Sequence, residues 1–85
     1  MQVMIPSVLQ SYTGAAQVEV EANSLEALFA TLDALYPGLR FRVIDEQDRF
    51  RRHMRCFVNG VQEFELSRAL LPQDDIVIIQ ALSGG

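Results

Sequence analysis

The chain has 85 residues, which is the length of one domain, and 49% of them are hydrophobic. A chain of this size buries roughly 60% of its unfolded surface, which supports one modest core and leaves little room for a deep substrate cleft. The net charge of −4 argues against a nucleic-acid partner, because displacing phosphate counterions requires an excess of Lys and Arg.

The cysteine content and the N-terminus give no sign of an oxidising compartment or a membrane. One cysteine cannot form an internal disulfide. The opening "MQVMIPSVLQ" lacks a basic region, and its apolar run is too short for a signal peptide. No stretch approaches the roughly 18 apolar residues of a membrane span. We therefore expect a cytoplasmic protein.

The basic residues are all arginine and are unevenly distributed. Six of the seven lie between Arg40 and Arg55, and Arg68 is the exception. A run of charge is commonly a solvated loop. The other interpretation is a docking patch for a protein partner, and the sequence leaves both open.

The first part of the chain predicts two strands. Residues 2–9 are rich in Val, Ile and Met and predict a strand with a break near Pro6, which has no N–H to donate. Residues 17–22 alternate strictly, which places Val18 and Val20 on one face of a half-buried strand. We expect these two strands to form a hairpin.

The next segment changes to helical spacing. Asn23 is predicted to cap the helix, with Glu26 three residues later completing a capping box, and Pro37 and Gly38 stop it. The pattern is that of an amphipathic helix lying on a sheet. The apolar side chains on its predicted buried stripe are Leu25, Leu28, Phe29, Leu32, Leu35 and Tyr36.

The middle of the chain is less regular. The stretch that begins at Leu39 predicts a short helical turn and then a polar turn at "DEQD". "RCFVNG" predicts a strand that ends in Asn59-Gly60, a strong hairpin signal, and residues 62–66 predict a short strand after it.

The last segment predicts the centre of the sheet. Pro72 fits the second position of a turn, which Asp74 and Asp75 continue as solvated residues. The apolar run "IVIIQAL" predicts a central strand buried on both faces. The order of elements predicts an α+β fold, in which one main helix packs on one face of a mixed sheet of four to five strands. The last strand should lie beside the first, so that the chain leaves from the middle of the sheet.

This order resembles the β-grasp, or ubiquitin-like, fold, and within it the MoaD/ThiS family of small sulfur carriers. The resemblance spans the chain and rests on "IPSVLQSYTGA", "NSLEALFATLDALYPGL", "RHMRCFVNG" and "DDIVIIQALSGG". The Arg-rich stretch makes the chain most similar to the longer MoaD-like members. Two features depart from the family: Pro72-Gln73-Asp74 replaces an Asp-Gly-Asp, and Gln80 stands where many relatives have Pro.

The resemblance implies a carrier rather than an enzyme. Residues 1–85 would form a single domain with an exposed Gly-Gly tail at 83–85. An adenylating partner of the MoeB/ThiF type would transfer AMP from ATP, with Mg, to the carboxylate of Gly85, and a sulfur donor would convert it to a thiocarboxylate. A biosynthetic enzyme would take the sulfur. A metalloprotease would be needed if the chain is made with a C-terminal extension. The carrier itself would bind no cofactor and no metal.

The tail has the properties that such chemistry requires. Gly84 and Gly85 lack a β-carbon, so the backbone can enter a narrow channel and adopt dihedrals closed to other residues. Ser83 is small enough to follow, and Leu82 and Ala81 would supply apolar contacts at the channel mouth.

Other residues are candidates for docking or for separate chemistry. Cys56 is predicted to be a core residue, because nothing nearby activates its thiol, and His53 beside it does not complete a zinc site. Strand side chains alternate, so some apolar residues of the third and last strands must point away from the helix and mark a partner surface. The candidates for docking are Phe57, Ile78, Gln80, Arg52 and Arg55.

Two alternatives to a sulfur carrier remain open. Activated Gly85 could instead form an isopeptide bond with lysines of other proteins, as in a ubiquitin-like modifier. A non-reacting interaction domain with an incidental tail is the third reading. The receiving pathway is also open among cysteine-type amino acids, thio-containing metabolites, molybdopterin and thiamine.

Overall fold

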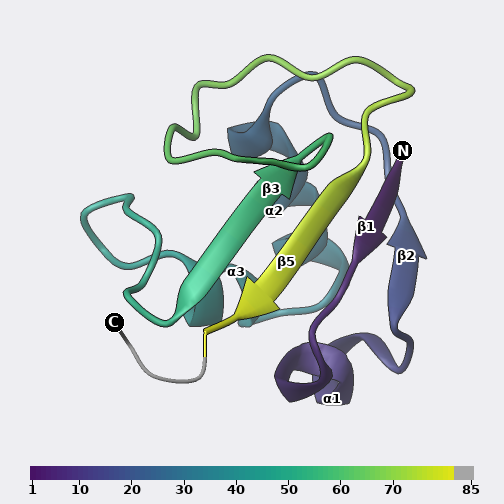
Figure 1. Cartoon of the computed structure of the whole chain (residues 1–85). Coiled ribbons are helices and arrows are strands. Elements are labelled where there is room, and N and C mark those ends of the chain that lie inside the picture. Colours follow the sequence, from purple (N-terminus) through teal and green to yellow (C-terminus); the bar gives the residue numbers. More distant parts are fainter. Residues whose placement is uncertain (82–85) are drawn as a thin grey trace.

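Within residues 1–81, which are the residues that the computed structural model describes, the chain forms a five-stranded mixed sheet with helices behind it (Figure 1). The strand order is β2-β1-β5-β3-β4. β5 is central, parallel to β1 and antiparallel to β3. The predicted α+β fold, with the last strand beside the first, is confirmed. The elements are β1 (Gln2–Met4), the 3-10 helix η1 (Ser7–Leu9), α1 (Gln10–Thr13), β2 (Gln17–Glu19), α2 (Leu25–Leu35), α3 (Leu39–Val43), β3 (Met54–Val58), β4 (Val61–Gln62) and β5 (Ile76–Gln80).

The core lies between the sheet and α2. The inward side chains of β1, β5 and β3 are fully buried and lie in register, with Val3 opposite Ile76 and Cys56 opposite Ile78. The helix contributes Leu25, Leu28, Phe29 and Leu32, which are all buried. Two residues of the predicted stripe differ, because they lie at the C-terminal end of α2, where the core no longer covers them fully. Leu35 is 56% exposed and Tyr36 is only partly buried.

The start and stop of α2 show which local signals the chain uses. The N-cap is Ser24, whose hydroxyl oxygen accepts a hydrogen bond from the backbone N–H of Ala27 at 3.1 Å. The predicted capping box of Asn23 and Glu26 is therefore wrong by one residue. The stop is as predicted: Gly38 takes φ 95°, a left-handed conformation that favours glycine, and its N–H donates to Asp33.

The N-terminal segment also differs from prediction. The strand predicted over residues 2–9 is too long: β1 ends at Met4, residues 7–9 form a 3-10 helix, and α1 follows directly. Leu9 of this segment is buried, and Val8 and Tyr12 pack against the core. This spacing of three and four residues gives the short helices an apolar face. β1 and β2 still pair antiparallel as expected, with Val3 opposite Val18.

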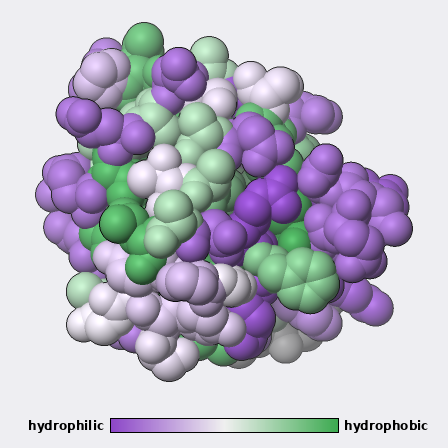
Figure 2. All heavy atoms as spheres, turned by 180° about the vertical axis from the view of Figure 1, so that it is seen from behind, coloured by the Kyte–Doolittle hydropathy of each residue, from purple (hydrophilic) through white to green (hydrophobic). Residues whose placement is uncertain are grey.

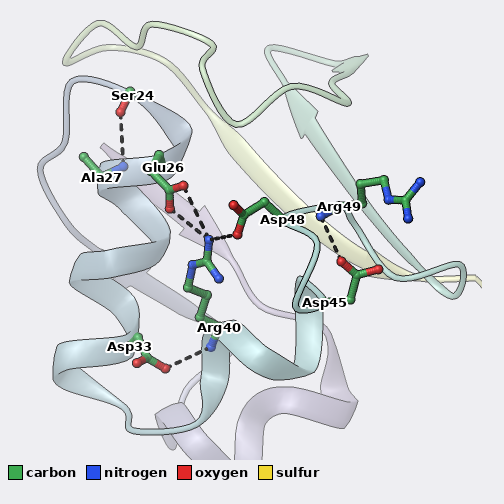
Figure 3. A network of polar contacts seen from close by, with 8 residues as sticks. All are labelled: Ser24, Glu26, Ala27, Asp33, Arg40, Asp45, Asp48 and Arg49. Carbon is green, nitrogen blue, oxygen red and sulfur yellow. Dashed lines mark hydrogen bonds and ion pairs between the residues drawn. The ribbon is translucent and has the colours of Figure 1, made fainter.

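The expected helical turn after Gly38 is α3, and a network of charges ties it to its neighbours. The Arg40 guanidinium lies 3.1 Å from Glu26 of α2 and 3.2 Å from Asp48 of the following turn (Figure 3). The backbone N–H of Arg40 donates to Asp33. These contacts fix the direction in which the chain leaves α3 for the Arg-rich segment.

The hairpin after β3 forms as predicted. Asn59 and Gly60 both have positive φ, 51° and 83°, as a two-residue type I′ turn requires. The strand that follows is shorter than expected and covers Val61–Gln62. The expected turn at Pro72 is present, because Asp74 N–H donates to the carbonyl of Leu71 at 3.0 Å.

Candidate functional site

The candidate site begins where the chain leaves the sheet. β5 ends at Gln80 beside the start of β3 (Figure 1). The next residue, Ala81, donates its N–H to the carbonyl of His53 at 2.7 Å and is half-buried. The predicted reactive and threading residues Leu82, Ser83, Gly84 and Gly85 lie outside the described residues. The tail therefore starts at Ala81, at the end of the central strand and next to the Arg-rich segment that contains His53.

The face of the sheet away from the helices carries an apolar strip. Because side chains alternate along a strand, the residues between the buried positions of β1, β3 and β5 point to this outer face. Met4 and Phe57 lie on either side of Val77, and Ile79 follows two residues along β5. Met4 is 41% and Ile79 38% exposed, whereas Val77 and Phe57 are half-buried. The strip leads along β5 toward the chain exit.

Two of the predicted docking residues lie elsewhere. Ile78 is 1% exposed, points toward α2 and belongs to the core, so it is not available to a partner. Gln80 has the same parity as Ile78 but is exposed, because the helices do not cover the end of β5. The expectation that β5 is buried on both faces is also wrong: only Ile76 and Ile78 are buried. Phe57 does lie on the outer face, as expected.

Sequence reasoning missed three members of the strip, Met4, Val77 and Ile79. The apolar run "IVIIQ" contains no alternation from which its inward face could be read. The available signal was indirect: strand β3 alternates more clearly, with Met54, Cys56 and Val58 buried and Arg55 between them. Pairing of Cys56 with Ile78 then assigns Ile78 to the core and Ile79 to the outer face.

The predicted docking arginines flank the chain exit. Arg55 lies on the outer face of β3, opposite Ile79. Its guanidinium donates to the carbonyls of Arg52 and Met54, at 2.7 and 3.1 Å. Arg52 is exposed in the loop before β3. Both therefore border the end of the strip where Ala81 leaves the sheet.

Cys56 has the environment of a structural residue. It is 1% exposed, and burial raises the pKa of its thiol to about 12, with a smaller contribution from the nearby Glu63 carboxylate. A neutral, enclosed thiol is a poor nucleophile. Within residues 1–81, no group of three His, Cys, Asp or Glu side chains could hold a metal ion. In the same part of the chain, no helix is long and apolar enough to cross a membrane.

The strand order and the helix across one face define a ubiquitin-like β-grasp protein. The chain is 29% identical over 89 residues to the sulfur carrier protein CysO of Mycobacterium tuberculosis, with 98% of this chain and 96% of that protein covered. No protein-family model matches the chain. These findings and the structural similarity below confirm the predicted resemblance: the chain is similar in sequence and in fold to a ubiquitin-like sulfur carrier protein.

The crystal structure of M. tuberculosis CysO matches with a TM-score of 0.88 at 26% identity, covering 95% of this chain and 98% of that one. A chain of the Amycolatopsis orientalis BexX/CysO complex gives the same TM-score at 23% identity, over 99% and 98% of the two chains. Small archaeal modifier protein 1 of Haloferax volcanii matches at 0.76 and 22% identity, over 100% and 98%. The last two matches support the fold alone.

Proposed function

We propose that this protein is a sulfur carrier that acts through the carboxylate of Gly85. One observation carries the proposal: a chain 29% identical to a sulfur carrier over nearly its whole length has a central strand that ends at Gln80, with three residues between it and the pair Gly84-Gly85. The described residues provide a scaffold and a docking surface, and the reaction takes place on the tail.

The proposed chemistry has two steps. A carboxylate is a poor electrophile, because its leaving group would be oxide. An adenylating partner uses ATP and Mg²⁺ so that a Gly85 oxygen attacks the α-phosphorus and pyrophosphate leaves. Sulfide then attacks the acyl carbon of the adenylate, AMP leaves with the oxygen, the sulfur loses its proton, and a thiocarboxylate remains. The carrier supplies no acid, base or metal ligand, so it is a co-substrate rather than an enzyme.

The outer apolar strip is the proposed docking surface for the partners. Exposed apolar side chains gathered on one face are typical of interaction sites. Met4, Val77, Ile79 and Phe57 line the route to the chain exit. A sulfur-accepting biosynthetic enzyme would bind the same face and receive the tail. These partners are inferred from the relatives and from the position of the strip.

The test is the intact mass of the chain after incubation with an adenylating enzyme of the same genome, ATP and sulfide. We expect a gain equal to one oxygen replaced by sulfur, mapped to Gly85 and absent from a chain that lacks Gly85. The internal control is Cys56→Ala, which should react as the native chain does because the buried thiol takes no part.

Two outcomes would contradict the carrier role. An adenylate that forms and never gains sulfur would favour a protein modifier, and a ladder of conjugates on lysines of other proteins would establish it. No mass change with an enzyme that adenylates its own carrier would leave the tail without chemistry and favour an interaction domain.

A further inference from the structure

Residues 49–55 concentrate positive charge on a chain that is acidic overall. They include four arginines and one histidine with no acidic residue, whereas the net charge of the chain is −4. Seen from the helix side, hydrophilic side chains gather where the segment after α3 lies (Figure 2). An acidic surface would be attracted to this segment and repelled by the rest of the molecule, so it would dock in one orientation.

The segment is anchored to the core and is hollowed on both sides. Phe50 packs edge-on against Phe29 of α2, with ring centroids 5.9 Å apart. Two clefts of about 410 and 530 Å³ share Phe50, Arg51 and Arg52 as walls. Arg55 and Phe64 complete the first, and Arg49 and His53 the second. Arginine beside exposed aromatic surface is the composition of protein interfaces.

Two guanidinium groups of the segment, those of Arg51 and Arg55, are held in place by carbonyl oxygens. Arg51 Nε donates to the carbonyl of Phe41 at 2.6 Å, and its guanidinium lies 4.4 Å from the centre of the Phe41 ring. Arg55 donates to the carbonyls of Arg52 and Met54. These contacts orient the side chains without neutralising their charge. Less side-chain entropy is then lost when a carboxylate binds.

Each cleft also contains one carboxylate, which is already engaged. Glu63, in the first cleft, lies 3.0 Å from Arg68. Asp45, in the second, accepts hydrogen bonds from the backbone N–H groups of Gln47 and Arg49 at 2.9 and 3.1 Å. Positive charge therefore predominates at both openings.

We propose that residues 49–55 bind a cluster of Asp and Glu side chains on the adenylating protein that receives the tail. This inference rests on the proposed function. The hydrogen bond from Ala81 to His53 fixes the start of the tail against this segment. A protein that encloses Gly85 therefore reaches the clefts as well. A nucleic acid is disfavoured as the partner. Its phosphates would be attracted to this segment, but the net negative charge of the whole chain would repel the rest of the polyanion.

The test compares steady-state adenylation of the native chain and of the double variant Arg49→Gln/Arg55→Gln by the adenylating enzyme, at several salt concentrations. We expect KM for the carrier to rise about tenfold at low salt, with a much smaller change in kcat, because two exposed charge pairs are lost. The difference should shrink as salt is added. The control is Arg42→Gln, which removes one positive charge from α3 outside both clefts and should leave KM within about twofold of the native value.

The possible outcomes distinguish a failure of this inference from a failure of the proposed sulfur-carrier function. If an active enzyme does not adenylate the native chain, the proposed function fails and the inference fails with it. If the native chain is adenylated and the double variant has the same KM and salt dependence, only the inference is overturned. Saturable binding of a fluorescent single-stranded RNA that the double variant loses would assign the segment to nucleic acid and overturn the inference too. Circular dichroism melts of both variants establish that they fold.

Discussion

At the scale of single residues, Asp74 is the clearest case of a side chain that stabilises the fold rather than acting in chemistry. It is 6% exposed, so the expectation of a solvated turn is wrong for this residue. Its carboxylate accepts hydrogen bonds from Leu71 N–H at 2.8 Å and from the Asn59 amide at 2.9 Å. It thereby joins the hairpin after β3 to the turn that begins β5.

These two hydrogen bonds, led by that from Leu71, hold the pKa of Asp74 below its ordinary value. A carboxyl whose pKa is lower in the folded state stabilises the protein above the unfolded pKa, and this stabilisation is lost as pH falls through the folded pKa. With an unfolded value of about 3.9, the loss begins below about pH 4. We expect Asp74→Asn to lower the urea midpoint at about pH 7. Between about pH 5 and about pH 3, the urea midpoint of this variant should fall by less than that of the native protein.

The control for this prediction is Asp75→Asn. Asp75 is exposed, and its backbone N–H, rather than its carboxylate, bonds to Asn59. Urea midpoints that fall equally in both variants would contradict the specific role of Asp74 and indicate a general effect of charge near the turn.

At the scale of elements, the capping of α2 distinguishes two adjacent residues that both qualify by type. Ser24 accepts the hydrogen bond from Ala27 (Figure 3), whereas the side chain of Asn23 is exposed. Ser24→Ala should lower the free energy of unfolding by about 1 kcal/mol, and Asn23→Ala should change it by less than about 0.5 kcal/mol. Chemical denaturation of the two variants measures both values. A larger loss for Asn23→Ala would restore the capping box that the sequence predicted.

The sequence predicted those elements whose signals are local and unambiguous. The spacing of Leu25, Leu28 and Leu32, the break at Gly38 and the Asn59-Gly60 turn each depend on a few adjacent residues, and each appears as expected. The error at Ser24 arose because Asn and Ser both cap helices, so the pattern fixes the helix start only to within a residue.

Elements that depend on distant contacts were less predictable. Residues 7–13 contain Val8 and Leu9, which favoured a strand, but packing of Leu9 against the core selects a helical turn. The inward face of β5 is set by its pairing with β3 and not by its own composition. At the candidate site, the position of Ala81 against His53 likewise depends on residues far apart in the sequence. The role of Gly85 as the reactive end was inferred from the resemblance to sulfur carriers, and it stays a prediction.

At the scale of the whole molecule, the two faces of the sheet differ in burial. Ile78 and Ile79 are adjacent and chemically identical, yet the first is 1% and the second 38% exposed. The inner face, against α2, carries the buried apolar side chains of β1, β3 and β5. The outer face presents the strip that leads to the tail. A pair of matched substitutions can therefore test the division directly.

Ile78→Ala should lower the free energy of unfolding by about 3 kcal/mol, because it removes three buried carbons and leaves a cavity. Ile79→Ala should cost less than about 1 kcal/mol, since much of its side chain already contacts water. For docking to the adenylating enzyme we expect Ile79→Ala to have the larger effect. At a temperature where both variants are folded, Ile79→Ala should raise KM for adenylation severalfold. Ile78→Ala should leave this KM close to the native value. Equal KM values for the two folded variants would remove the strip from the proposed docking surface, while the stability difference would still establish which face is the core. The two measurements together decide whether the outer face is recognised or merely exposed.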